Sequence, residues 1–435
     1  MDLNGQILES KSQLLQTANG HDQIQDLRTK AMQVFENEGF PTIKHEEWKY
    51  TSLVPILRKN YSLTASAGKV SKEEVEKYSL KTDSYRLVFV DGGFSEEHSD
   101  LENAPFTFLT LSNALGSKEE ALNLFGKIAP IEDQAFVALN TAFAHQGSFL
   151  HIPKGTRVEK PIELLYFTSK AQNEAPFFQI RNLILAEQAS ETQIYERHQN
   201  LGESAALSNV VTEIKVERDA IYDHYKVQND QRDTALVDNT WVEQAENSFA
   251  SVDTFSLGGR FVRNNLSFLQ RGEHCESKMY GITMIGENQL VDHHTLVDHK
   301  VPNCQSNQLY KGIYTDNAKG VFNGKVYVHS EAQKTNAFQQ NDNVLLDDLA
   351  SLDTKPQLEI FADDVKCSHG CTIGQLDEDA MFYLKSRGIR DKEARAMLLY
   401  AFCMDALAGV KLEELKSKLK SVLAKKLGVE LDFDL

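Results

Sequence analysis

The chain has 435 residues, 25% of them charged, and its 63 acidic and 46 basic residues give a formal net charge of −17. Such a surface repels phosphate backbones and anionic membranes, which argues against nucleic acid as the main partner. No apolar run is long enough to span a bilayer, and we expect no secretory signal at the start. Five cysteines are too few, and odd in number, for a disulfide framework, which predicts reduced thiols in a cytoplasmic protein.

The first part of the chain is typical of a mainly helical domain, which we predict over residues 1–145. Apolar residues recur at helical spacing from Asp22 to Phe40 and again over residues 112–145, and Leu87–Gly93 is typical of a buried strand ending in a turn. The Glu46-Glu47 pair has a catalytic interpretation, but a solvated turn with Trp48 buried against this domain is favoured.

From about Gly147 to Gly374 the pattern changes to short segments with period-two alternation, separated by Gly, Asn, Asp and Pro. No crossover helix interrupts them, which excludes a Rossmann-type fold or an α/β barrel. Antiparallel sandwiches and a right-handed parallel β-helix with several strands per coil remain. Because only Asn323-Gly324 is a clear tight-hairpin pair, we predict a parallel β-helix (solenoid) over residues 146–376, a length that a stacked fold tolerates.

After the solenoid we predict a C-terminal helical domain over residues 377–435. Asp377 is expected to cap a helix that ends at Gly388, and Asp391 to cap a second that ends near Gly409. A third helix is expected from Lys411 to Lys426, followed by an acidic, mobile terminus at Glu430–Leu435. The protein is thus predicted to be mainly β, with helical domains on both sides of the solenoid.

A cluster of soft ligands lies where the strands give way to helices. Strand alternation would send Cys367, His369 and Cys371 to one face, and thiolate and imidazole suit iron, Fe–S clusters, copper or zinc. A strand end with small buried cysteines and a hydrogen-bonded histidine fits equally well. Two or three ligands are an incomplete set, so a metal site here needs a second subunit. The sequence places Cys275, Cys304 and Cys403 far away, with no second pair among them.

A second histidine-rich segment, Val291–His299, divides between two faces. His294 falls with Asp292 and Asp298, and His293 with His299, which leaves a mononuclear metal site or polar residues on the solenoid as alternatives. Walker A, Gly-x-Ser-x-Gly, His-Glu-x-x-His and dinucleotide motifs are absent from the sequence.

The chain resembles the SufB/SufD family of Fe–S cluster assembly proteins, and the SufD branch more closely than the SufB branch. The matching blocks span almost the whole chain: Glu47–Thr51, Leu309–Ile313, Gly320–Lys325, Gln333–Ala337, Lys355–Ile360, Ala362–Gly370 and Phe382–Ile389. The resemblance implies a right-handed parallel β-helix between two helical domains, in a chain that is no enzyme by itself.

The resemblance also implies a complex in which the chain pairs with SufB through the β-helix and with the ATPase SufC through the C-terminal helices. A homodimer is compatible with it when the chain is alone. His369, with Cys367 beside it, would then contribute to a nascent Fe–S cluster or iron shared transiently with SufB, while nucleotide binds another chain. Many SufD chains have alanine at the position of Cys371, so its role as a ligand stays open. SufC would contact Phe382, Tyr383, Leu384, Arg387, Gly388 and Ile389.

Two other functions fit parts of the sequence. Parallel β-helices also host polysaccharide-acting enzymes, which need carboxylate pairs or a basic residue in an exposed groove. A purely structural partner whose Cys367 and His369 never contact metal is the other alternative.

Overall fold

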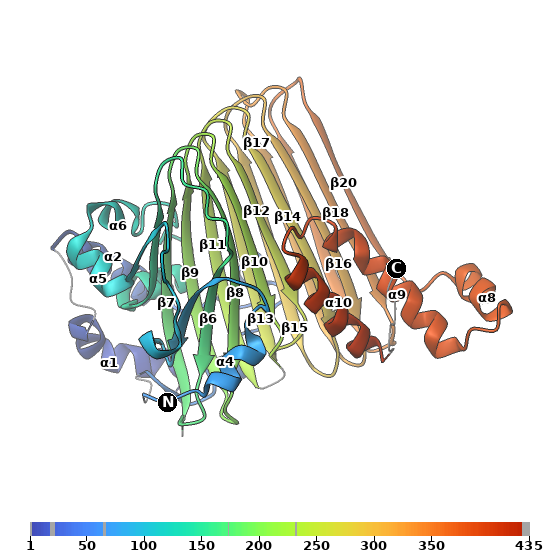
Figure 1. Cartoon of the computed structure of the whole chain (residues 1–435), viewed down its shortest axis with the longest axis horizontal. Coiled ribbons are helices and arrows are strands. Elements are labelled where there is room, and N and C mark those ends of the chain that lie inside the picture. The colour runs from blue at the N-terminus through green and yellow to red at the C-terminus, as the bar shows by residue number, and fades with distance from the viewer. Residues whose placement is uncertain (1, 18–21, 64–66, 173, 231–232, 429–435) are drawn as a thin grey trace.

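The computed structural model describes residues 2–17, 22–63, 67–172, 174–230 and 233–428 (Figure 1). Its α-helices are α1 (Leu3–Thr17), α2 (Asp22–Glu38), α3 (Val54–Leu57), α4 (Lys72–Tyr78), α5 (Leu111–Ser117), α6 (Glu119–Leu124), α7 (Ala135–Phe143), α8 (Glu378–Ser386), α9 (Asp391–Leu407) and α10 (Glu413–Leu427). Short 3₁₀ turns are η1 (Glu46–Trp48) and η2 (Glu96–His98).

The early strands are β1 (Tyr61–Ser62), β2 (Tyr85–Val90), β3 (Gly93–Phe94), β4 (Thr107–Thr110), β5 (Gln146–Ile152), β6 (Ile162–Thr168), β7 (Ala175–Ala186), β8 (Glu191–Asn200), β9 (Ala206–Val216) and β10 (Ile221–Gln228). The later strands are β11 (Thr234–Gln244), β12 (Phe249–Ser256), β13 (Phe261–Gln270), β14 (Glu276–Ile285), β15 (Leu290–His299), β16 (Gln305–Tyr314), β17 (Lys319–Val328), β18 (Asn336–Leu345), β19 (Ser351–Ile360) and β20 (Lys366–Gly374).

These strands form two sheets that face each other along a solenoid. Odd-numbered strands from β5 to β19 make one sheet, and even-numbered strands from β6 to β20 make the other, so each coil has two long strands rather than several. Every pairing between coils is parallel and in register, which excludes the antiparallel sandwich and confirms the predicted parallel β-helix between helical segments. Asn323-Gly324 is no hairpin, because both residues lie within β17.

The corners that lead into β8, β10, β12, β14, β16 and β18 are built alike. A residue in the left-handed region is followed by a small residue, which begins the return toward the next strand. The left-handed residues are Ala189, Asp219, Asn247, His274, Asn303 and Lys334, and the small ones are Ser190, Ala220, Ser248, Cys275, Cys304 and Thr335. We call the second set the corner column, because successive coils stack its members on one another.

The N-terminal helices cover the outer face of the odd-numbered sheet. All nine residues of α7 are buried, since this helix lies between the sheet and α1 and α2. A fully buried ion pair fastens the segment after α6 to the sheet: Arg181 contacts Glu213 at 2.5 Å, and Glu213 also accepts backbone N–H groups of Gly126, Ile128 and Ala129. Such a carboxylate is stable in the interior because its oxygens are hydrogen-bonded.

The η1 turn is solvent-exposed at Glu46 and Glu47, as the favoured interpretation predicts, but Trp48 is half-buried rather than buried. Trp48 stacks on Phe136 with ring centroids 5.6 Å apart, and the Arg263 guanidinium lies 4.3 Å from the Trp48 ring. Glu47 contacts His294 at 3.0 Å. The turn therefore joins the N-terminal region to the outer face of the odd-numbered sheet.

The C-terminal helices α9 and α10 pack on the outer face of the even-numbered sheet, whereas α8 extends past the last strand (Figure 1). Asp377 caps α8 as predicted, through Asp379 and Ala380 N–H groups, and Gly388 ends it with a positive φ of 86°. Asp391 is not a cap but the first residue of α9, where its carboxylate contacts Lys385 at 2.8 Å.

The three-domain division stays a prediction; β2 and β4 already join the two sheets before residue 146. The expected mobile terminus, Glu430–Leu435, lies outside the described residues. Among the described helices, none combines the length and the apolar character needed to cross a membrane.

A buried carboxylate beneath the turn between α9 and α10 generates a stability prediction. Burial raises the pKa of Asp253 from 3.8 to about 7, and hydrogen bonds from Ser251 and the Tyr280 N–H offset this only in part. The second carboxylate oxygen has no partner among the described residues. Ionising this carboxyl group therefore costs more free energy in the folded protein than in the unfolded chain.

We expect Asp253→Asn to stabilise the fold above pH 7, by at most about 4 kcal/mol for a shift of about three pKa units. Because the pKa is higher in the folded state, protonated Asp253 adds to the stability of the fold at low pH. This contribution is lost as the pH rises from 3.8 to about 7. The gain should thus shrink toward pH 4. Urea unfolding near both pH limits measures it, and an equal effect at both would contradict the assignment.

Candidate metal half-site at the open end of the solenoid

The last strand of each sheet has one free edge. β20 pairs with β18 and β19 pairs with β17, and no other described strand continues either sheet. At the opposite end, the sheets finish in the antiparallel strands β3 and β4. The solenoid is therefore open at one end, and its final coil presents unpaired backbone N–H and C=O groups.

The predicted ligands lie on the inner side of this final coil. Cys367, His369 and Cys371 are paired in register with Ala337, Gln339 and Asn341, whose side chains are buried inside the solenoid. Parallel in-register neighbours point the same way, so the prediction that the three share one face is confirmed. Along an extended strand their Cα atoms are separated by about 6.6 Å at each step.

The three side chains differ in their surroundings. His369 is exposed, whereas Cys367 and Cys371 are half-buried. Burial raises the pKa of the Cys367 thiol. Cys371 is engaged inside the coil, where its Sγ lies 3.3 Å from Thr354 Oγ1 and 3.9 Å from Asn341 Oδ1. Cys367 and His369 are thus free of the hydrogen bonds that hold Cys371.

Polar side chains of the preceding coils lie below His369. Gln339 donates to Gln308 at 3.2 Å, and Thr295 donates to the same Gln308 oxygen at 2.6 Å. The Gln339 Oε1 atom is buried without a partner in the described chain, directly one coil below His369. This oxygen can accept a hydrogen bond from a group that enters at the open end.

Two glycines of the family-like blocks make room for amide side chains here. A Cβ at Gly324 would lie 2.2 Å from Gln339 Nε2, and a Cβ at Gly370 would lie 2.2 Å from Gln340 Oε1. A glycine in a strand permits a close approach of another segment or an unusual backbone angle, and Gly370 shows the first of these. Its φ is not positive, and the close neighbour is Gln340 of the preceding coil.

No group of three or more His, Cys, Asp or Glu side chains in the described residues is placed to hold a metal ion. The His294 alternative fails for a geometric reason. Its two ring nitrogens contact Glu47 at 3.0 Å and Asp292 at 3.1 Å, while Asp298 is 2.7 Å from both Arg271 and His329. His294 lines a cavity, but both of its ring nitrogens are engaged, whereas His369 makes no ion pair within the described residues.

Apolar side chains surround the open end. Five of them are exposed although large: Phe338, Leu349, Ile360, Phe361 and Ile373. Beyond them, α8 has no buried residue and exposes 75% of Phe382 and 57% of Tyr383, while Leu384 and Ile389 are half-buried. Exposed apolar side chains gathered in this way are typical of interaction surfaces.

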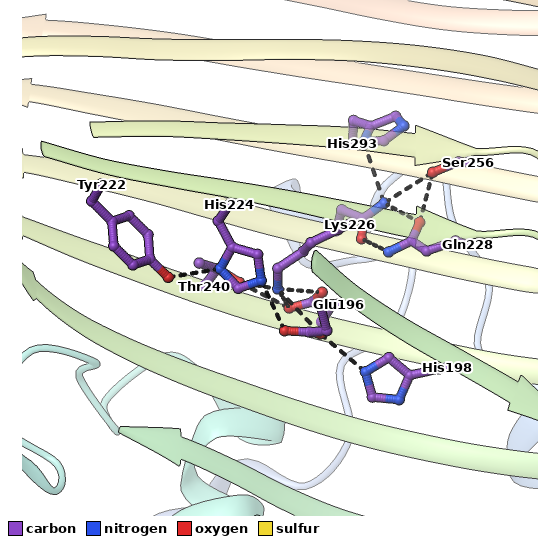
Figure 2. A network of polar contacts seen from close by, with 11 residues as sticks. Glu196, His198, Tyr222, His224, Lys226, Gln228, Thr240, Ser256 and His293 are labelled. Atoms are coloured by element: carbon purple, nitrogen blue, oxygen red, sulfur yellow. Dashed lines mark hydrogen bonds and ion pairs between the residues drawn. The ribbon is translucent and has the colours of Figure 1, made fainter. Parts of the chain in front are cut away.

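A cluster of buried charges in the middle of the solenoid escaped sequence analysis (Figure 2). Lys226 contacts Asp238 at 2.7 Å and Glu196 at 3.7 Å, and Glu196 contacts His224 at 3.1 Å and His198 at 3.0 Å. Burial opposes charge on these groups, yet Lys226 and the two histidines hold the pKa of Glu196 well below its usual range. Burial lowers the pKa of His224, which keeps its imidazole neutral.

The signal for such clusters is the coil period. Gln305 is paired with Glu276, 29 positions earlier, and polar residues separated by one period stack inside the solenoid. The prediction that the remaining cysteines form no pair is wrong. Cys275 and Cys304 are also 29 positions apart and lie in adjacent coils. Local spacing in the sequence does not reveal this pair, because the two cysteines become neighbours only when the coils stack.

Comparison with known proteins covers nearly the whole chain. Residues 167–402 match the family described as SUF system FeS cluster assembly, SufBD core domain, and residues 6–164 match the SufBD protein N-terminal region. The chain is 31% identical over 390 residues to the iron–sulfur cluster assembly protein SufD of Escherichia coli, covering 89% of this chain and 90% of the relative.

Two further relatives agree. An iron–sulfur cluster assembly SufBD family protein of Synechocystis is 32% identical over 399 residues, covering 88% of this chain and 87% of the relative. The chloroplastic protein ABCI7 of Arabidopsis thaliana is 29% identical over 392 residues, covering 87% and 81%.

The buried cluster generates a prediction. Lys226→Met leaves Glu196 and Asp238 without their cation, and we expect a loss of about 3–5 kcal/mol in unfolding free energy at neutral pH. Lys215→Met is the matched control, because the Lys215 side chain is 44% exposed and its change should stay within about 0.5 kcal/mol. Urea unfolding compares the two, and equal losses would show that the cluster is not a stabilising unit.

Proposed function

The chain belongs to the SufBD family of iron–sulfur cluster assembly proteins, and we propose that it acts in this assembly as a non-enzymatic scaffold. In this proposal it binds SufB through the open end of the solenoid and the ATPase SufC through the C-terminal helices. It supplies half of the site on which a nascent cluster is built and passed on. The cluster is cargo of this site rather than a resident cofactor.

Strand pairing supports the contact with SufB. The free edges of β19 and β20 need hydrogen-bond partners, and the apolar side chains beside them need cover. A second solenoid of the same family has an equivalent edge, so edge-to-edge pairing satisfies both chains. The same argument accounts for a homodimer when this chain is alone.

The incomplete ligand set supports the shared site and is the observation that carries the proposal. Cys367 and His369 face the open end, and the described chain offers no third and fourth ligand there. Thiolate and imidazole are suitable ligands for iron and for Fe–S clusters, which need about four in total. A site divided between two chains binds its cargo when they meet and weakens when they separate.

The exposed helix α8 supports the contact with SufC. Its apolar residues Phe382 and Tyr383 are exposed, Phe382 lines a cavity with Leu346 and Ile373 at the end of the solenoid, and Gly388 turns the chain into α9. Because the sequence has no phosphate-binding loop, nucleotide binding belongs to the partner. Movement of that partner on ATP binding could then be passed along α9 to the strands beneath it.

The first prediction concerns His369. In a complex reconstituted without oxygen from this chain, SufB and SufC, we expect His369→Ala to lower the iron and sulfide content more than about tenfold, because a ligand is lost. The measurements are the absorption spectrum and the chemical analysis of iron and sulfide.

His98→Ala, at the far end of the solenoid, serves as the control and should leave the content unchanged. Co-purification of SufB with both variants shows that assembly survives. Unchanged iron and sulfide in His369→Ala would support a purely structural partner instead.

The second prediction concerns α8. Replacing Phe382 and Tyr383 together with alanine should weaken SufC capture at least about tenfold, since two large apolar contacts are removed. Ile43→Ala is the matched control, because Ile43 is 58% exposed but lies between α2 and η1 in the N-terminal region. Pull-down of SufC by the three proteins measures the effect; undiminished capture by the double variant rules out this surface.

A further inference from the structure

The corner column of the solenoid contains two thiols in adjacent coils. Cys275 precedes β14 and Cys304 precedes β16, and the Gln305 N–H donates to the Cys275 carbonyl at 2.8 Å. This bond holds the two corners in register, so the Cα atoms of the two cysteines are about 4.8 Å apart. That separation lies within the range of about 4.4–6.8 Å that a disulfide spans.

The two thiols also share their surroundings. Both donate to the Gly272 carbonyl, from Cys275 Sγ at 3.0 Å and from Cys304 Sγ at 3.3 Å. A hydrogen bond from the Cys304 thiol lowers the pKa of Cys275, and the same contact, together with burial, raises the pKa of Cys304. The two sulfurs thus lie against one shared carbonyl and interact with each other.

Corner packing does not by itself require sulfur. In the neighbouring coils Ser248 donates to the Ala245 carbonyl at 2.7 Å, and Thr335 donates to the Ala332 carbonyl at 2.8 Å. These hydroxyls bond the carbonyl three residues earlier, as Cys275 does with Gly272. Serine would serve the corner equally well, so the adjacent thiols add a chemical capacity that the other corners lack.

We propose that Cys275 and Cys304 are a redox-active dithiol that hydroperoxides convert to a disulfide linking two consecutive coils. The Cys275 thiolate attacks the peroxide, the O–O bond breaks, and a sulfenic acid and water or alcohol are formed. The Cys304 sulfur then attacks the sulfenic sulfur and releases water. Two electrons and two protons leave the dithiol, and the peroxide is reduced.

The position of the two thiols determines how peroxide reaches them and what the disulfide changes. The thiols are buried, but they lie directly after the turns at residues 271–274 and 300–303, and Glu273 and His274 in the first turn are exposed. A molecule as small as hydrogen peroxide needs only a local opening of such a turn. The disulfide would link the coils of β14 and β16, on whose outer face α9 packs. Oxidation therefore stiffens the support of the C-terminal helices.

The test treats the reduced, full-length native chain with hydrogen peroxide, blocks the remaining thiols and maps non-reduced peptides by mass spectrometry. We expect a peptide pair joined through Cys275 and Cys304, two hydrogens lighter than the sum of its parts and separated by reductant. The oxidised protein should also unfold at a higher urea concentration than the reduced protein, because the link constrains the unfolded chain.

Cys275→Ser and Cys304→Ser should each abolish both effects while keeping the corner hydrogen bond, as Ser248 does. Cys371→Ser is the matched control and should retain both. Oxidation of the half-buried Cys367 in the same sample shows that the peroxide was active. The proposal is overturned if Cys367 is oxidised but the pair stays reduced, or if the link forms only after unfolding and refolding in glutathione buffer.

Discussion

The constraint on which the structure depends is the in-register stacking of parallel strands. Each strand bonds to the strand one coil earlier and one coil later, so residues about 29 positions apart become neighbours about 4.8 Å apart. A property needed at one corner is therefore needed at every corner, which explains the repeated left-handed residue and the small residue after it. The same stacking brings together the charges of Glu196 and Lys226 and the thiols of Cys275 and Cys304, while Asp238 contacts Lys226 from the facing strand β11.

A stack of this kind needs an ending. At its start the described chain provides one, since β3 and β4 run antiparallel and close the two sheets. At its end, β19 and β20 keep free edges, beside exposed apolar side chains and the candidate ligands Cys367 and His369. The unpaired backbone groups and the candidate ligands thus lie at the same end of the solenoid. One additional chain could supply partners to both, which is why the proposed assembly role centres on this end.

Different helices cover the two outer faces of the solenoid, and its open end stays exposed. The odd-numbered sheet is covered by N-terminal helices fixed through Glu213 and Arg181, which are fully buried. The even-numbered sheet is covered by α9 and α10, with Asp253 beneath their connecting turn. Among the described C-terminal helices, α8 alone leaves this arrangement, and it carries Phe382 and Tyr383 into solvent past the last strand. The surfaces proposed for the two partners are therefore distinct.

Local pattern in the sequence determined the class of fold and the candidate ligands. Period-two alternation without crossover helices predicted the solenoid, and the same alternation placed Cys367, His369 and Cys371 on one face. Contacts between coils were decided only by the tertiary structure, because register depends on corner lengths that vary from coil to coil and leave no fixed repeat to read. That is why Asn323-Gly324 resembled a hairpin turn, why Gly370 makes room for Gln340, and why Cys275 and Cys304 seemed unrelated.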